Sequence, residues 1–373
     1  MTRRTRLIAG GLGLLALTGL TACGSDAPSG RTPADDLTPA AASAGASGES
    51  GLPTVEAPLF SADSPWNSRV DALPVDPDSA SMLRLAQRSV GVVERAGVVR
   101  TETVVADDPL YINTSAWTVP VVQGGEPTQV VCRQLVCGDG DQAHPLTLDV
   151  PADVDPDPRY DGWFTVLDDD GTTAYDLWRA RREDDGTLSY QYLRTWDLSG
   201  PGYGEPGQTS ARGSGLPLAA GLIRPGELQN GLIDHALAIS VPGPAAGSYV
   251  EPASSTDGTG SARSLPEGAR IRLRADVTIP VPRDPRTGER IRLTAQQQRL
   301  ADAIVAALRT YGAIVVDRAT VPTLYAQAGV TSGLLSGNEL QGLHLSDFEV
   351  VTLGTRHRAG DPTAATPDAE ATR

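Results

Sequence analysis

Apolar and polar residues alternate most clearly over residues 232–241, which predicts a half-buried β-strand. One face of this strand carries three large apolar side chains and one imidazole, from Ile233, His235, Leu237 and Ile239. Asp234 points to the other face, so His235 and Asp234 cannot pair with each other. Two interpretations of His235 stay open: a general base that takes its partner from elsewhere in the chain, or a core histidine bonded to backbone.

Short alternating runs separated by Asp-Gly pairs predict a meander of antiparallel strands. The runs cover residues 163–167, 173–178 and 188–196, with Gly171 and Gly186 in the two turns. An Asp-Gly pair favours a hairpin because the turn needs a residue with positive φ. Within the second run, Asp176 and Trp178 share one face.

A few helices accompany the strands. Thr294 and Gln297 form a capping box that opens a helix as far as Arg309, and Gly312 suits the left-handed position after it. Shorter helices are expected over residues 79–86 and 225–229. Further short strands are expected at residues 100–105, 110–112, 117–122, 128–132, 146–150, 269–273, 313–316 and 348–353. The patterns predict a mainly β fold: a β-sandwich or jelly-roll-like single domain with a few peripheral α-helices.

The N-terminus reads as a secretory signal. Three arginines precede an apolar run at residues 7–20, which is too short for a stable membrane span, and small residues lead to Cys23. The segment ending at Cys23 resembles a bacterial lipobox. That resemblance implies a signal peptide over residues 1–22 and a lipid on Cys23, which would hold the protein outside the cytoplasmic membrane. A plain signal peptide without lipid is the alternative.

Composition divides the rest of the chain. Residues 23–58 are mostly Ala, Ser, Gly and Pro, and cannot bury enough apolar surface to fold, so we expect a disordered tether. Residues 59–354 show no second break in composition and are expected to form the β-rich domain. Residues 355–373 again resemble a disordered tail.

Charge and cysteine content exclude several functions. The 373-residue chain has a net charge of −15 and contains no lysine. An acidic surface argues against nucleic-acid partners, and the lack of lysine removes Schiff-base chemistry and Walker-type phosphate loops. Cys132 and Cys137 are expected to form a disulfide, with a metal site that uses His144 and nearby aspartates as the alternative. We expect no cofactor and no metal.

The candidate chemistry centres on His235 as acid or base, with Asp317, Glu227 or Tyr311 as its partner. Trp178, Trp196 and Asp176 are candidates for a platform on which a sugar ring could stack, while core packing is the alternative for the tryptophans. Paired carboxylates of a glycosidase could come from five acids, although no short spacing marks any pair: Asp176, Asp197, Glu227, Asp257 and Asp317.

Two other patterns are weaker. The acidic runs at residues 168–170 and 183–185 suit hairpin tips better than calcium loops. Ser214 lacks the G-x-S-x-G context of a serine nucleophile.

The chain also resembles an uncharacterised family of secreted bacterial proteins. The resemblance rests on the following motifs: Ser64-Pro65-Trp66-Asn67, residues 73–79, Gly215-Leu216-Pro217-Leu218, residues 221–224, Ile233-Asp234-His235-Ala236-Leu237, residues 307–312 and residues 347–351. It supplies a domain extent and no mechanism. The chain departs from the pattern of this resemblance at two places. Where the chain has Arg212, the family pattern has an acid, and where it has Arg318-Ala319, the pattern reads Asn-Gly.

These observations favour a lipid-anchored extracytoplasmic protein that binds or acts on cell-envelope or environmental carbohydrate, as a hydrolase or lyase if it is an enzyme. A non-enzymatic glycan-binding protein and a structural envelope lipoprotein are the alternatives.

Overall fold

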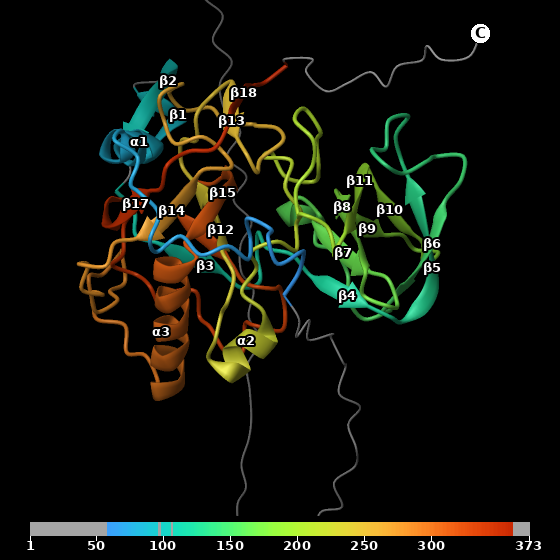
Figure 1. The fold of residues 1–373 in the computed structure, drawn as a ribbon. Helices are drawn as coiled ribbons and strands as arrows, with labels where there is room; N and C mark the ends of the chain where they lie inside the picture. Colours follow the sequence, from blue (N-terminus) through green and yellow to red (C-terminus); the bar gives the residue numbers. More distant parts are fainter. Residues whose placement is uncertain (1–57, 96–97, 106, 361–373) are drawn as a thin grey trace, which may run out of the picture. The chain divides into compact units, whose positions relative to one another are not determined.

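The computed structural model describes residues 58–95, 98–105 and 107–360. The predicted signal peptide, Cys23, the tether up to residue 57 and the tail beyond residue 360 lie outside these residues. Strand residues outnumber helical ones, 27% against 13%, and the strands form several sheets, none of them closed. The prediction of a mainly β fold with a few α-helices is confirmed (Figure 1).

The largest sheet has six strands and holds one side of the candidate site. In order across the sheet these are β17 (Phe348–Val350), β14 (Arg270–Leu273), β15 (Ala313–Arg318), β12 (Leu237–Val241), β16 (Thr323–Tyr325) and β3 (Tyr111–Asn113). One face of this sheet packs against the helices α1 (Ser79–Ala86) and α3 (Ala295–Thr310), through side chains such as Met82, Leu300 and Ile304. Since these helices cover one face, the other face is left to meet the second sheet.

Two four-stranded sheets complete the layers. The second sheet has the order β11 (Tyr192–Asp197), β8 (Thr173–Trp178), β7 (Phe164–Leu167) and β4 (Val121–Gln123). The third has the order β6 (Leu146–Val150), β5 (Glu126–Cys132), β10 (Leu188–Tyr190) and β9 (Arg181–Arg182). Phe164, Leu177 and Leu193 pack between these two sheets, together with side chains of β5 and β10.

A separate apolar layer lies between the second sheet and the six-stranded sheet. Strand residues such as Ala174 and Leu167 from the second sheet join Ala238 and Ile314 from the six-stranded sheet. The irregular segment at residues 211–222 also contributes to this layer, through Leu216, Leu218 and Leu222. We call this the middle layer.

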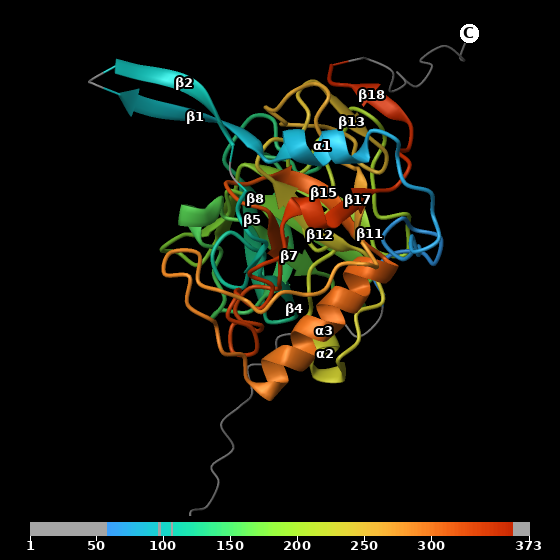
Figure 2. The same cartoon turned by 90° about the vertical axis from the view of Figure 1, so that its left-hand side faces the viewer.

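The remaining elements are small. β1 (Arg88–Arg95) and β2 (Val98–Val105) form a hairpin that follows α1 and extends away from the sheets (Figure 2). β13 (Ser248–Val250) pairs with β18 (Arg356–Arg358), so part of the segment predicted as a tail is a strand. Helix α2 (Pro225–Asn230) and two 3-10 turns, η1 (Pro158–Tyr160) and η2 (Leu345–Asp347), complete the fold.

A β-bulge determines where the end of β15 points. β12 and β15 run parallel, with Ile239 opposite Val315 but Ser240 opposite Asp317, so Val316 is an extra residue. Without the bulge, Asp317 would share the face of Val315, which packs against the helices. Because the bulge shifts the alternation by one residue, Asp317 lies beside Ser240 on the side of the middle layer.

Local predictions were mostly confirmed, but several strands differ: β1 was not predicted, the strand expected over residues 117–122 is confined to Val121–Gln123, and the one expected over residues 348–353 ends at Val350. The capping box of Thr294 and Gln297 is present at α3, and Gly312 has φ +70°. The strand predicted over residues 232–241 begins only at Leu237, because the preceding residues take the backbone of a loop. The run at residues 188–196 divides at Gln191 into β10 and β11, which belong to different sheets.

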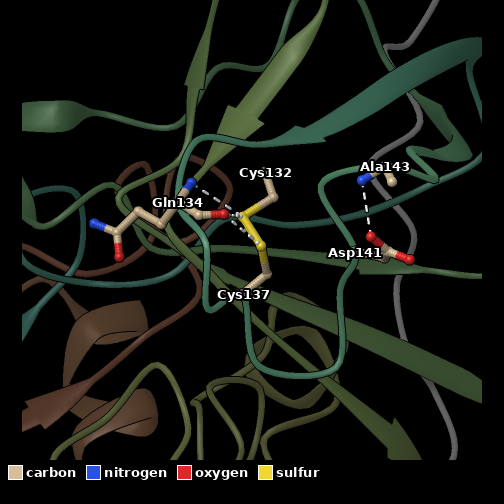
Figure 3. The surroundings of a disulfide bond; sticks show 5 residues. All are labelled: Cys132, Gln134, Cys137, Asp141 and Ala143. Atoms are coloured by element: carbon tan, nitrogen blue, oxygen red, sulfur yellow. Dashed lines mark hydrogen bonds between the residues drawn. A yellow bond between two sulfur atoms is a disulfide. The ribbon is translucent and has the colours of Figure 1, made fainter.

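The Cys132–Cys137 disulfide predicted from sequence is present, at the end of β5 (Figure 3). It closes a loop whose Leu135 and Val136 are exposed. The disulfide uses both thiols, so the alternative metal site with these cysteines is not formed. Among the described residues, no helix is long and apolar enough to cross a membrane.

Candidate functional site

His235 lies in a buried polar cluster with Glu227 and Arg224. Its Nε2 is 2.8 Å from Oε1 of Glu227, and its Nδ1 is 2.9 Å from the carbonyl oxygen of Ala236. Glu227 belongs to the first turn of α2 and also accepts from Nε of Arg224 at 2.8 Å. Burial alone would raise the pKa of Glu227, but the charges and hydrogen bonds of His235 and Arg224 outweigh burial and lower it. Glu227 and the carbonyl oxygen of Ala236 thus occupy both ring nitrogens of His235.

The other predicted partners of His235 lie elsewhere. Asp317 is at the far end of the β12–β15 pair, opposite Ser240. Tyr311 is the C-cap of α3, and its ring carries the guanidinium of Arg69 at 5.9 Å. Within the described part of the chain, no hydrogen bond joins His235 to Asp317 or Tyr311. The cavity next to His235 has a volume of about 10 Å³, close to the minimum that one water molecule needs.

The three residues of the predicted sugar platform also separate. Asp176 is fully buried and accepts from the Thr165 hydroxyl at 2.6 Å, the Leu218 amide at 2.6 Å and the Trp196 indole at 2.8 Å. Burial raises the pKa of Asp176 to about 6, against the lowering effect of these donors. Trp178 is half-buried, with the Arg179 guanidinium 4.7 Å from its ring. Of the platform residues, only Trp178 presents part of its ring to solvent, since Trp196 and Asp176 bond each other inside the middle layer.

Three carboxylates converge at the end of β15, one from β15 itself and two from the loop before β14. Ligating oxygens of Asp257, Glu267 and Asp317 lie within 4.8 Å of one another. Asp317 is aimed by the bulge in β15, and Glu267 by the backbone on either side of it, since its carbonyl accepts from Val250 and the amide of Gly268 donates to Val315. We call this group the carboxylate cluster.

The carboxylate cluster is closed on one side and open on the other. Glu267 is fully buried and Asp317 is 8% exposed, whereas the Asp257 side chain is 37% exposed. Nε of Arg318 donates to Oδ2 of Asp257 at 2.7 Å, and the Arg318 side chain is 53% exposed. Solvent therefore reaches the cluster through Asp257 and Arg318.

Mutual repulsion and burial disfavour three ionised groups in this space. Burial, and then the charge of Asp257, raises the pKa of Asp317 to about 7. Burial, and then the charges of Asp317 and Asp257, raises the pKa of Glu267 well above its usual value. Such a cluster must be neutralised by protons, by basic side chains or by a bound cation.

Arg212 lies on the middle-layer side of the carboxylate cluster. It is 2% exposed, and its guanidinium carbon is 5.1 Å from the ring centre of Tyr325 and 5.8 Å from that of Trp163. None of its three guanidinium nitrogens has a hydrogen-bond partner among the described residues. Arg212 and Arg318 thus both place a guanidinium beside this cluster.

The structure brings together only some of the acids that the sequence nominated. Of the five candidates for a carboxylate pair, Asp257 and Asp317 are close together, while Asp176, Asp197 and Glu227 lie apart from them. Sequence reasoning missed Glu267. Its place in the Pro-Glu-Gly turn directly before β14 was a usable signal, because polar residues at strand ends are often functional.

Two weaker candidates gain no support. The Ser214 hydroxyl is buried and has no hydrogen-bond partner in the described structure, so no base activates it there. Asp168 and Asp170 bond the Thr172 side chain at the hairpin tip between β7 and β8, as expected for a turn.

No family model, no curated protein and no solved structure matches the chain.

Proposed function

We propose that the protein is a lipid-anchored extracytoplasmic protein that binds or acts on cell-envelope or environmental carbohydrate, with the carboxylate cluster as its functional centre. The observation that carries the proposal is the convergence of Asp257 and Glu267, from the loop before β14, with Asp317 on β15, with one side open to solvent. Structural ion pairs rarely need three acids in one place, because the repulsion is costly.

The open side offers the groups that sugar recognition uses. The Asp257 and Arg318 side chains are both partly exposed there, and Arg318 presents further N–H donors next to the Asp257 carboxylate. Carboxylates accept from sugar hydroxyls, and guanidinium groups donate to ring and hydroxyl oxygens. Should a glycosidic bond be hydrolysed here, the separation below 4.8 Å is too short for the roughly 6.5–9.5 Å of inverting enzymes, so a retaining outcome is expected.

The membrane partner is proposed from the sequence. The arginines, apolar run and small residues before Cys23 support cleavage at residue 22 and a lipid on Cys23. The anchor would hold the domain at the outer face of the cytoplasmic membrane, on a tether of residues 23–58.

A polysaccharide panel tests the proposal. The purified full chain is assayed for binding, for released reducing ends and for unsaturated products, alongside Asp257→Asn and the control Asp169→Asn, which changes an exposed acid at a hairpin tip. We expect binding or turnover that falls at least tenfold in Asp257→Asn and is unchanged in the control. Turnover identifies a hydrolase or lyase, and binding alone identifies the glycan-binding alternative.

The nearly sealed state of Glu267 and Asp317 favours one further candidate, a structural envelope lipoprotein. In that case neither binding nor turnover is detected for any glycan, and the carbohydrate proposal fails.

A further inference from the structure

When its three acids are ionised, the carboxylate cluster carries more negative charge than its own basic neighbours offset. Arg318 pairs with Asp257, and Arg212 lies close enough to Asp317 to favour its ionised form. Three acids facing two guanidinium groups leave an excess of negative charge in a site that is mostly buried. Protons or a bound cation must offset that excess, because no other basic side chain among the described residues bonds these acids.

The second observation is an acceptor without a donor. Glu267 is fully buried and points into the cluster, yet its Oε1 has no hydrogen-bond partner among the described residues. Oδ1 of Asp257 is also buried and lacks a partner as well. A buried carboxylate oxygen without a donor is costly, and native structures usually satisfy it with water or an ion.

We propose that Asp257, Glu267 and Asp317 together bind one divalent cation, and that Ca²⁺ is the ion that fits best. The inference shares its location with the proposed function but does not require that carbohydrate binds there. All three donors are carboxylate oxygens, which suit Ca²⁺ and Mg²⁺ rather than Zn²⁺ or Cu²⁺. Oxygens at roughly 2.3–2.6 Å from Ca²⁺ can lie up to about 5 Å apart, whereas the shorter bonds to Mg²⁺ demand a tighter set.

The neighbouring arginines determine the affinity that we expect for the cation. Arg318 holds one oxygen of Asp257, and Arg212 adds a second positive charge nearby, so both compete with a cation. We therefore expect a dissociation constant on the order of 10⁻⁴–10⁻³ M, the range of extracellular calcium modules. The same competition predicts that loss of Arg318 strengthens binding.

Calorimetric titration with CaCl₂ and with MgCl₂ tests the inference on the full chain, in detergent, after EDTA treatment and dialysis. We expect one Ca²⁺ per chain, weaker binding of Mg²⁺, and a melting temperature that rises with Ca²⁺. Glu267→Gln and Asp317→Asn should bind at least tenfold more weakly. Arg318→Gln should bind at least threefold more tightly, and Asp169→Asn should not differ from the wild type.

Several results would overturn the inference. One is the absence of saturable Ca²⁺ binding up to 10 mM, roughly ten times the weakest expected constant. Another is binding that persists in Glu267→Gln and Asp317→Asn, which would locate the ion at exposed acidic turns. Where those two variants do not fold, Arg318→Gln decides, since this side chain is half exposed and an unchanged or weaker affinity contradicts the proposal.

The two proposals can fail separately. Carbohydrate binding or turnover in EDTA without any Ca²⁺ binding removes only the cation site. Ca²⁺ binding without any glycan ligand removes only the proposed function.

Discussion

Asp176 shows how a single residue joins the layers of this protein. Its carboxyl, on β8, accepts from Thr165 on β7, from Trp196 on β11 and from the amide of Leu218 in the irregular segment. Three donors stabilise a carboxyl at this position, although full burial disfavours its charge and raises the pKa of Asp176 to about 6. The group therefore binds a proton more readily in the folded state than in the unfolded chain.

That shift predicts how stability depends on pH. The folded pKa of Asp176 lies above its ordinary value of 3.8, so its contribution is fully present below pH ~4 and is lost as the pH rises through about 6. A pKa that differs by about two between the unfolded and folded states corresponds to roughly 3 kcal/mol of stability. In Asp176→Asn the amide oxygen can face Trp196 and Leu218, and Nδ2 can donate to the Thr165 hydroxyl. We expect the variant to gain stability relative to the wild type between pH 4 and pH 7.

Urea unfolding at several pH values in that range measures the difference between the two proteins. Asp317 and Glu267 also have raised pKa values and act in the same direction in both proteins, so the comparison of slopes isolates Asp176. Parallel stability curves for the two proteins would contradict the assignment.

Glu227 carries a second residue-scale prediction. Its carboxylate bonds Arg224 and His235 in a site where all three side chains are buried. Removing one member of a buried charge cluster typically costs about 3–5 kcal/mol. We expect Glu227→Ala to lower the free energy of unfolding by that amount in urea denaturation. The control Glu205→Ala, which changes an exposed acid, should stay within about 0.5 kcal/mol.

At the scale of elements, the turn at the end of α3 determines where β15 begins and therefore where Asp317 lies. Gly312 has φ +70°, and a Cβ on it would lie 2.3 Å from the carbonyl oxygen of Ile271 on the neighbouring strand β14. Gly231 at the end of α2 has a similar φ of +68°, but a Cβ there would meet nothing within 4 Å. Substitutions at the two glycines therefore distinguish the cost of backbone strain from the cost of close packing.

We expect Gly231→Ala to cost about 1–2 kcal/mol, the strain of a left-handed residue alone. Gly312→Ala should cost at least about 2 kcal/mol more, because the six-stranded sheet must also move to admit the methyl group. Thermal and urea unfolding of both variants measure the difference. Equal losses would mean that the sheet gives way at Gly312 without cost.

Elements whose signals are local were predictable from the sequence. The capping box at Thr294, the glycine after α3 and the Asp-Gly turn at Gly171 depend on neighbouring residues only, and the structure confirms each one. The division of the run at residues 188–196 depends on contacts far away in sequence. There β10 pairs with β5 and β11 with β8, so apolar alternation alone could not show the break at Gln191.

The candidate site was less predictable, for a related reason. Asp317 was expected at the exit of a buried strand, and it is there, but the bulge at Val316 that turns it toward the middle layer has no sequence signature. Asp257 and Glu267 reach it from a loop whose path is set by backbone bonds to other segments, such as Val250 to Glu267. His235 was expected on the apolar face of a strand with its exposure left open; it is buried in the loop before β12, and its pairing with Glu227 was one of the options considered.

For the whole molecule, the layered order explains why polar groups gather where they do. The middle layer joins two sheets through the irregular segment at residues 211–222, which cannot satisfy its own backbone and side chains as a strand would. Asp176 and Asp317 reach this layer from the two sheets that face each other. The guanidinium of Arg212 interacts electrostatically with both carboxyl groups. A ligand or ion at the carboxylate cluster would therefore act on the junction of both sheets.

The lipid anchor is the last whole-molecule prediction. A thioether-linked lipid needs the thiol of Cys23, so Cys23→Ser should abolish it, whereas Ser25→Ala, two residues further on, should not. Growth of a bacterial host with a labelled fatty acid tests both variants: we expect label on the wild type and on Ser25→Ala, and none on Cys23→Ser. Mass spectrometry of the N-terminal peptide should show that the wild-type chain starts at Cys23. An unlabelled wild-type chain that starts at another small residue would identify a plain secretory signal, and the domain would then act free of the membrane.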